Sequence, residues 1–191
     1  AVTPYYYSTY EGGSSEHGID FVPGLAGSTK QRIVVVGSGP IRIGQGIEFD
    51  YGCVHAAGAI QDLGHEAIII NNNPETVSTD FDTSDRLYFD PLTLECVTEV
   101  LLREDANGIL LQFGGQTAIN LALPLADTLP HLSDLGLELV MEGTTPEAVD
   151  EASDRERFER FAARCGLRMP DGVTVTTPDG VREAANEIGY P

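Results

Sequence analysis

Basic residues are scarce in this chain of 191 residues. The sequence contains 11 Lys and Arg against 30 Asp and Glu, which gives a formal net charge of −19, and Lys30 is its only lysine. Nucleic acids and anionic membranes both attract proteins through clusters of basic side chains. We therefore expect neither a nucleic acid nor a membrane among the partners of this protein.

Cysteine is also rare, and tryptophan is absent. The three cysteines contain no C-x-x-C pair, so they predict neither a disulfide framework nor a zinc site. No apolar run approaches the roughly 20 residues of a membrane helix, and the opening residues lack the pattern of a secretory leader. We expect a cytoplasmic protein, and the 41% of hydrophobic residues can supply its core.

The chain has three compositional regions. Residues 1–29 are rich in Tyr, Gly and Ser and are interpreted as a linker. In residues 30–144, short runs of Val and Ile alternate with helix-length segments, which predicts an α/β fold with a doubly wound parallel sheet. The predicted strands are Arg32–Val36, Ala67–Ile70, Gly108–Leu111 and Leu137–Val140. The predicted helices are Ile47–Leu63, Leu94–Arg103 and Thr117–Thr128, the last one kinked or ended by Pro124.

Residues 145–191 form a separate segment of mixed pattern. Its predicted helices are Pro146–Glu151, Asp154–Cys165 and Asp179–Ile188, with a strand at Val173–Val175. In the second helix, a stripe of apolar residues runs along one side with Arg155 at its margin. Arg157, Arg160 and Arg164 point away from that stripe, so we expect them to pair with carboxylates on a solvated face.

A glycine-rich loop follows the first predicted strand, from Gly37 to Gly46. Such loops can bind anions through backbone N–H groups, or they can simply pack a helix against a strand. The third glycine comes two residues too late for a dinucleotide loop, and Asn71 stands where a ribose-binding acid would end the second strand. Gln45 occupies the lysine position of a Walker A loop. A nicotinamide-dependent (NAD) Rossmann oxidoreductase and a non-catalytic docking module remain as alternatives.

Three polar segments follow neighbouring strands, namely residues 48–51, 73–80 and 114–117. Because the carboxyl ends of parallel strands meet at one edge of a sheet, we expect these segments to form one ligand site. Each has an ordinary structural explanation when taken alone. The candidate site residues in these segments and in the glycine-rich loop are Gly44, Gly46, Glu48, Glu75, Gly115, Gln116 and Thr117.

Four stretches of the sequence resemble the large chain of carbamoyl phosphate synthetase. They are GPIRIGQGIEFDYGCVHA (39–56), NPETVSTDFDTSDRLYFDPLTLE (73–95), FGGQTAINLA (113–122) and DRERF (154–158). The first two are similar to the second of its two synthetase halves, which phosphorylates carbamate. The resemblance implies a pre-ATP-grasp domain over residues 30–144 and the truncated start of an ATP-grasp domain over residues 145–191.

The resemblance also implies roles for individual residues. Arg155 matches a position that contacts the phosphates of ATP, while Glu48 and Glu75 match carboxylates that line the tunnel carrying carbamate. The reaction implied is ATP-dependent synthesis of carbamoyl phosphate from bicarbonate and glutamine-derived ammonia, for pyrimidine and arginine biosynthesis. The ligands for Mg or Mn would lie beyond Pro191, so we expect this 191-residue piece to be inactive alone.

The partners implied are the glutamine amidotransferase small chain and the rest of the large chain. Substrates such as ATP and bicarbonate do not call for a strongly acidic surface. We therefore interpret the charge of −19 and the single lysine as a halophilic adaptation to a salt-rich cytoplasm, where self-repulsion is screened.

Overall fold

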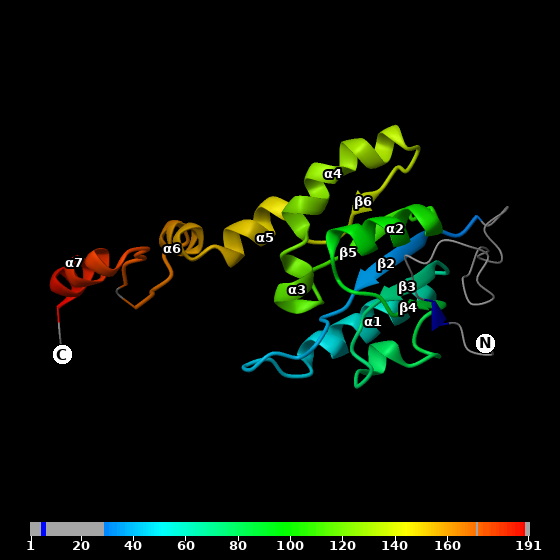
Figure 1. Cartoon of the computed structure of the whole chain (residues 1–191), viewed down its shortest axis with the longest axis horizontal. Helices are drawn as coiled ribbons and strands as arrows, with labels where there is room; N and C mark the ends of the chain where they lie inside the picture. The colour runs from blue at the N-terminus through cyan, green and yellow to red at the C-terminus, as the bar shows by residue number, and fades with distance from the viewer. Residues whose placement is uncertain (1–4, 7–28, 171, 190–191) are drawn as a thin grey trace. The chain divides into compact units, whose positions relative to one another are not determined.

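The computed structural model describes residues 5–6, 29–170 and 172–189. The chain forms two compact units, residues 1–146 and residues 147–191 (Figure 1). The linker predicted for residues 1–29 lies almost wholly outside the described residues.

The first unit is built on a six-stranded parallel sheet with the strand order β1-β4-β3-β2-β5-β6. The strands are β1 (Tyr5–Tyr6), β2 (Arg32–Val36), β3 (Glu66–Ile70), β4 (Arg86–Tyr88), β5 (Gly108–Leu110) and β6 (Val140–Met141). The central strands are almost entirely buried because helices cover both faces. The predicted doubly wound parallel sheet is therefore confirmed.

Helices of the first unit are α1 (Glu48–Asp62), α2 (Leu94–Glu104), α3 (Gly115–Ile119) and α4 (Ala122–Asp134), with a short 3-10 helix η1 (Val77–Thr79). Helix α1 covers one face, where Cys53 and Ile60 pack with Leu87 of β4. Arg86 and Tyr88 point to the opposite face because side chains alternate along a strand. Glu104 of α2 bonds to both of them, so α2 covers that opposite face.

Three local predictions differ from the structure. Pro124 does not end a helix, because it lies in the first turn of α4, where its missing N–H leaves no helical hydrogen bond unmade. The last strand is β6, at Val140–Met141, where it pairs with β5. Residues 173–175 form no strand, and no described residue pairs with them in a sheet. A strand without a partner has no hydrogen bonds to hold it.

The second unit contains α5 (Pro146–Ser153), α6 (Arg155–Arg164) and α7 (Pro178–Ile188). Arg157 pairs with Asp150, and Arg164 pairs with Glu151 at 2.6 Å, so two ion pairs connect α6 to α5. Arg160 pairs with Glu156 one turn earlier in α6. The predicted pairing of these three arginines with carboxylates is confirmed. Across the described residues, no helix has the length and apolar character needed to cross a membrane.

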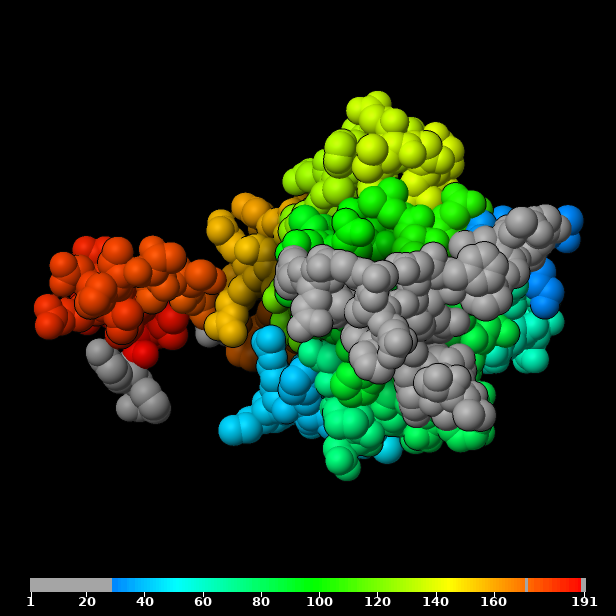
Figure 2. Space-filling model, turned by 45° about the vertical axis from the view of Figure 1, so that its right-hand side comes forward, coloured from blue at the N-terminus to red at the C-terminus, as the bar shows by residue number. Residues whose placement is uncertain are grey.

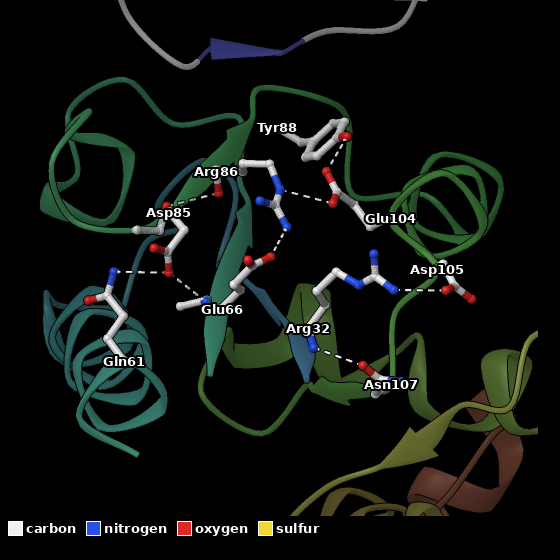
Figure 3. A network of polar contacts seen from close by, with 11 residues as sticks. Arg32, Gln61, Glu66, Asp85, Arg86, Tyr88, Glu104, Asp105 and Asn107 are labelled. Atoms are coloured by element: carbon white, nitrogen blue, oxygen red, sulfur yellow. Dashed lines mark hydrogen bonds and ion pairs between the residues drawn. The ribbon is translucent and has the colours of Figure 1, made fainter. Parts of the chain in front are cut away.

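An ionic network stabilises the amino edge of the sheet, which is the edge where the strands begin (Figure 3). Glu104 is fully buried and accepts hydrogen bonds from Arg86 Nε at 2.9 Å and from the Tyr88 hydroxyl at 2.6 Å. Arg86 also pairs with Glu66 at 2.7 Å. Burial of the guanidinium favours loss of its charge, but the bonds and charges of Glu66 and Glu104 raise the pKa of Arg86 above its usual value.

Arg32 connects this edge to the start of β5. Its guanidinium pairs with Asp105 at 2.8 Å, and its backbone N–H donates to Asn107 Oδ1 at 2.9 Å (Figure 3). Asp85 accepts from the Ala67 N–H at 2.8 Å just before β4 begins. The charges at the amino edge therefore hold strands and helices to one another.

Candidate functional site at the carboxyl edge

Asn71 is the central residue of the opposite, carboxyl edge of the sheet. It directly follows β3 and is 1% exposed. Its Oδ1 accepts from the Gly39 N–H at 2.9 Å, and its Nδ2 donates to the hydroxyls of Thr76 at 3.2 Å and Ser78 at 3.1 Å. One side chain thus joins the loop after β2 to the loop after β3.

Asn73 makes a second connection between the same two loops. Its Nδ2 donates to the Gly39 carbonyl at 3.2 Å, and its Oδ1 accepts from the Glu75 N–H at 3.1 Å. Gly39 has a φ of +66°, a conformation that favours glycine. The Gly39 backbone is therefore held from both sides, by Asn71 at its N–H and by Asn73 at its carbonyl.

Two further glycines allow the loops to approach closely. A Cβ on Gly37 would lie 2.3 Å from the Asn71 side chain, so glycine makes room for that amide. A Cβ on Gly114 would lie 2.3 Å from the Val36 carbonyl oxygen. The loop after β5 therefore packs directly on the backbone where β2 ends, and the three loops converge as the sequence predicts.

Asp50 of α1 fixes the position of η1. Its carboxylate accepts from the N–H groups of Val77 at 2.8 Å and Ser78 at 2.9 Å. These N–H groups open a short helix whose first donors have no partner within it. A carboxylate there satisfies them, so α1 holds the loop that carries Glu75.

The two candidate carboxylates, Glu48 and Glu75, are both exposed at this edge. Glu48 bends back to accept from the Gly46 N–H at 3.1 Å. Its own N–H and that of Gly46 lower the pKa of the Glu48 carboxyl, which stays ionised near neutral pH. Glu75 has its backbone N–H held by Asn73, while its carboxylate stands at the surface of the loop.

The glycine-rich loop stands out from the surface of the first unit (Figure 2), and Ile43 within it is fully exposed. Gly44 has a φ of +89° and is exposed. Gln45 closes the turn by accepting from the Arg42 N–H at 3.0 Å. A Cβ on Gly46 would lie 2.4 Å from the Glu48 carboxylate, so this glycine admits the bond between them.

The candidate residues after β5 lie beside the other loops. Gly115 has a φ of +62° and faces the ring of Phe49 on α1. A Cβ on Gly115 would lie 3.1 Å from that ring. Gln116 is exposed and donates to Asn120 Oδ1 at 2.7 Å. A Cβ on Gly39 would lie 3.9 Å from the Thr117 methyl group. Gly115 and Thr117 therefore adjoin the segment that follows β2, whereas Gln116 bonds within its own helix and cap.

Arg155 lies in the second unit, as the first residue of α6. Asp154 caps this helix by accepting from the Arg157 N–H at 2.8 Å. Arg155 is exposed, and its guanidinium makes no hydrogen bond or ion pair with the residues that the structure describes. Its charge is thus free to meet an anion.

Asn71, Asn73 and Asp50 contribute more to this edge than the sequence indicates. The sequence presents Asn71 only as a mismatch to a dinucleotide site, while Asn73 and Asp50 resemble ordinary turn and helix-start residues. Each of the three has a partner 27 to 34 residues away along the chain. The run of three asparagines at the end of a strand was the one available signal.

The dinucleotide alternative does not fit this geometry. An acidic side chain at the position of Asn71 would have to reach a ribose hydroxyl. The Asn71 amide is instead buried and occupied at both of its polar atoms. Among the described residues, no group of three or more His, Cys, Asp or Glu side chains is arranged so that it could hold a metal ion.

Comparisons with known proteins agree with the fold. Residues 29–166 match the carbamoyl phosphate synthase preATP-grasp domain family. The chain is 49% identical over its full length to the carbamoyl phosphate synthase large chain of Methanothrix thermoacetophila, and 51% identical to that of Methanosarcina mazei. It spans 17% of the length of each of these relatives.

Among solved structures, the biotin carboxylase domain of a single-chain bacterial carboxylase has a similar fold. Its TM-score is 0.54 at 17% sequence identity, covering 83% of this chain and 34% of that one. At this identity the likeness concerns the fold alone. The parallel sheet, the three converging loops and the match over residues 29–166 lead to one conclusion. The chain belongs to the carbamoyl phosphate synthase large-chain family and carries its preATP-grasp domain.

Proposed function

We propose that this chain acts within the large chain of a carbamoyl phosphate synthase, which phosphorylates carbamate with ATP to form carbamoyl phosphate. The observation that carries the proposal is the carboxyl edge, where Asn71, Asn73 and Asp50 hold two loops together beneath exposed Glu48 and Glu75. The motifs around these residues are similar to the second synthetase half. We assign the chain to that half.

In this proposal, Glu48 and Glu75 line the path by which carbamate reaches the second phosphorylation site. Both carboxylates are exposed on loops held by backbone hydrogen bonds. A polar lining lets a reactive polar intermediate pass, while surrounding protein walls exclude bulk water. Rigid loops suit that task because they keep the lining groups in fixed positions.

Arg155 is proposed to contact the phosphates of ATP. Its exposed guanidinium has no partner among the described residues, and α6 is anchored to α5 by the ion pairs of Arg157 and Arg164. Phosphoryl transfer depends largely on positioning and on neutralising the charge of the phosphates. A guanidinium on an anchored helix can supply both.

The test replaces Arg155 with Ala in the full-length enzyme. We expect carbamate-linked ATP use to fall, while bicarbonate-dependent ATP hydrolysis in the first half continues at its normal rate. Arg160→Ala is the matched control, since Arg160 lies on the same helix and pairs only with Glu156 among the described residues. Unchanged carbamate-linked turnover in Arg155→Ala would refute the assignment.

The remaining parts of the proposal concern the whole enzyme. A glutamine amidotransferase small chain would supply ammonia, and the rest of the large chain would supply the Mg or Mn ligands. The 191-residue chain alone should form no carbamoyl phosphate. The product would serve pyrimidine and arginine biosynthesis in the cytoplasm.

We also propose that the acidic composition is an adaptation to high salt. At a net charge of −19, the excess carboxylates repel one another strongly in dilute buffer. At 1 M salt the Debye length falls to roughly 3 Å, which screens that repulsion. We expect the chain to lose its fold as KCl is lowered from molar to millimolar concentration. A circular dichroism melt that is the same at both concentrations would contradict this expectation.

A further inference from the structure

We infer that Asn73 is a positioning residue, which holds the loop of Glu75 against the glycine-rich loop and thereby sets how efficiently carbamate is used. The inference rests on the proposed function, because it concerns the same carboxyl edge. It adds a residue whose side chain touches neither of the two candidate carboxylates. Asn73 acts through the backbone on which Glu75 is mounted.

The orientation of the Asn73 amide is determined by its backbone partners. The Gly39 carbonyl can only accept a hydrogen bond, so it must face the Nδ2 group, at 3.2 Å. The Glu75 N–H can only donate, so it must face Oδ1, at 3.1 Å. Asn73 is therefore a link with two distinct ends, one on each loop, and only an amide fits both.

The backbone of Asn73 is held as firmly as its side chain. Its carbonyl accepts from the hydroxyls of Thr76 at 2.7 Å and Thr79 at 2.9 Å. Asn73 is 8% exposed, so these bonds are shielded from water. The turn that follows it therefore cannot move relative to Gly39 without breaking buried hydrogen bonds, each of which is costly to leave unmade.

The position of Glu75 follows from this arrangement. Its N–H is bonded to Asn73 only two residues earlier, while its carboxylate is exposed. If the Gly39 end of the link is lost, Asn71 and Asp50 still hold the turn at Thr76, Val77 and Ser78, so the change falls on residues 73–75, where Glu75 is mounted. Displacements of about 1 Å in an active enzyme can reduce rates by roughly 100-fold.

The Asn73→Asp substitution keeps the bond at the Glu75 end of the link and removes the bond at the Gly39 end. The new carboxylate still accepts from the Glu75 N–H, but it repels the Gly39 carbonyl, which keeps only the longer bond from the Ser38 hydroxyl at 3.4 Å. In the full-length large chain with its small chain, we expect carbamoyl phosphate synthesis to fall by roughly tenfold or more, as for other misplaced groups. Bicarbonate-dependent ATP hydrolysis should persist, so more ATP is consumed for each carbamoyl phosphate formed.

Asn107→Asp is the matched control. Asn107 also accepts a backbone hydrogen bond, from Arg32 at 2.9 Å, but it lies at the amino edge of the same sheet. The ratio of ATP consumed to product should stay unchanged in this variant. Glu75→Gln is the reference for the proposed function and should raise the ratio by removing the carboxylate itself.

The outcomes distinguish the inference from the proposed function. If Glu75→Gln raises the ratio and Asn73→Asp does not, the positioning role is wrong. If Glu75→Gln also leaves the ratio unchanged, the proposed role of Glu75 fails, and the inference fails with it. Should Asn73→Asp not fold, Asn73→Ser removes the amide without adding a charge, and the same ratio decides.

Discussion

The two edges of the parallel sheet are built from different kinds of interaction. At the amino edge, Arg86, Glu66 and Glu104 form ion pairs in a largely buried network. At the carboxyl edge, the neutral amides of Asn71 and Asn73 join the loops after β2 and β3, and the Asp50 carboxylate accepts from two backbone N–H groups of η1. The charged side chains of Glu48 and Glu75 lie exposed at this edge.

This difference separates stability from function within one sheet. A buried ion pair satisfies its own charges and leaves none for a ligand. Neutral hydrogen bonds and close glycine contacts can shape a loop without using its charged groups. The amino edge is therefore a closed end of the sheet, and the carboxyl edge is an open end, where Glu48 and Glu75 are exposed.

The largest expected effect tests the closed end. Glu104→Ala removes a fully buried carboxylate and leaves the guanidinium of Arg86, 11% exposed, without one of its two ion pairs. Breaking a buried pair by removing one partner costs about 3–5 kcal/mol. We expect the free energy of unfolding, measured by urea denaturation in molar KCl, to fall by that amount.

Glu99→Ala is the control for this measurement. Glu99 lies on the same helix, α2, but is exposed. Its replacement should change the free energy of unfolding by no more than about 0.5 kcal/mol. Equal losses for the two variants would mean that the amino-edge network does not stabilise the fold.

A smaller effect is expected from Gly114→Ala, which tests the close packing at the open end. The added Cβ would lie 2.3 Å from the Val36 carbonyl oxygen and 2.5 Å from that of Gly37. Overpacking of this kind costs about 1–3 kcal/mol, and the loop after β5 must shift away from β2.

Gly58→Ala is the matched glycine substitution. Gly58 lies within α1, and a Cβ there would have no neighbour within 4 Å. Alanine should stabilise the helix by about 0.5–1 kcal/mol. Urea denaturation should therefore show changes of opposite sign in the free energy of unfolding of the two variants. Two changes of the same sign would contradict the packing argument.

The smallest effect concerns Cys53, the buried thiol beside the open end. Burial, with a smaller contribution from the Asp50 charge, raises its pKa from 9.0 to about 12. The stability that comes from keeping this thiol protonated is complete below pH 9 and is lost as pH rises from 9 toward 12. At pH 8 the native thiol should not react with a thiol reagent.

Labelling at pH 8 followed by peptide mass spectrometry tests this expectation. Cys165 is exposed and should react in the folded chain, whereas Cys53 should react only after denaturation. Rapid labelling of Cys53 in the native state would show that α1 opens readily over the end of β2.

The predicted elements agree with the structure where the sequence pattern is strong. The runs at Arg32–Val36 and Glu66–Ile70 are buried strands because helices cover both faces. Pro124 was misjudged because its effect depends on its place within a helix, and β4 was missed as a strand because it is short and begins with Arg86. Short segments such as these are determined by their neighbours in space.

The sequence by itself determined the acidic surface, the parallel sheet and the family, because these depend on composition, period and long motifs. The tertiary structure decided what the polar residues do. Asn71, Asn73 and Asp50 bond to partners about 30 residues distant, and Glu104 meets Arg86 across 18. Such partners become neighbours only when the strands pair in register, so no local pattern in the sequence predicts these contacts.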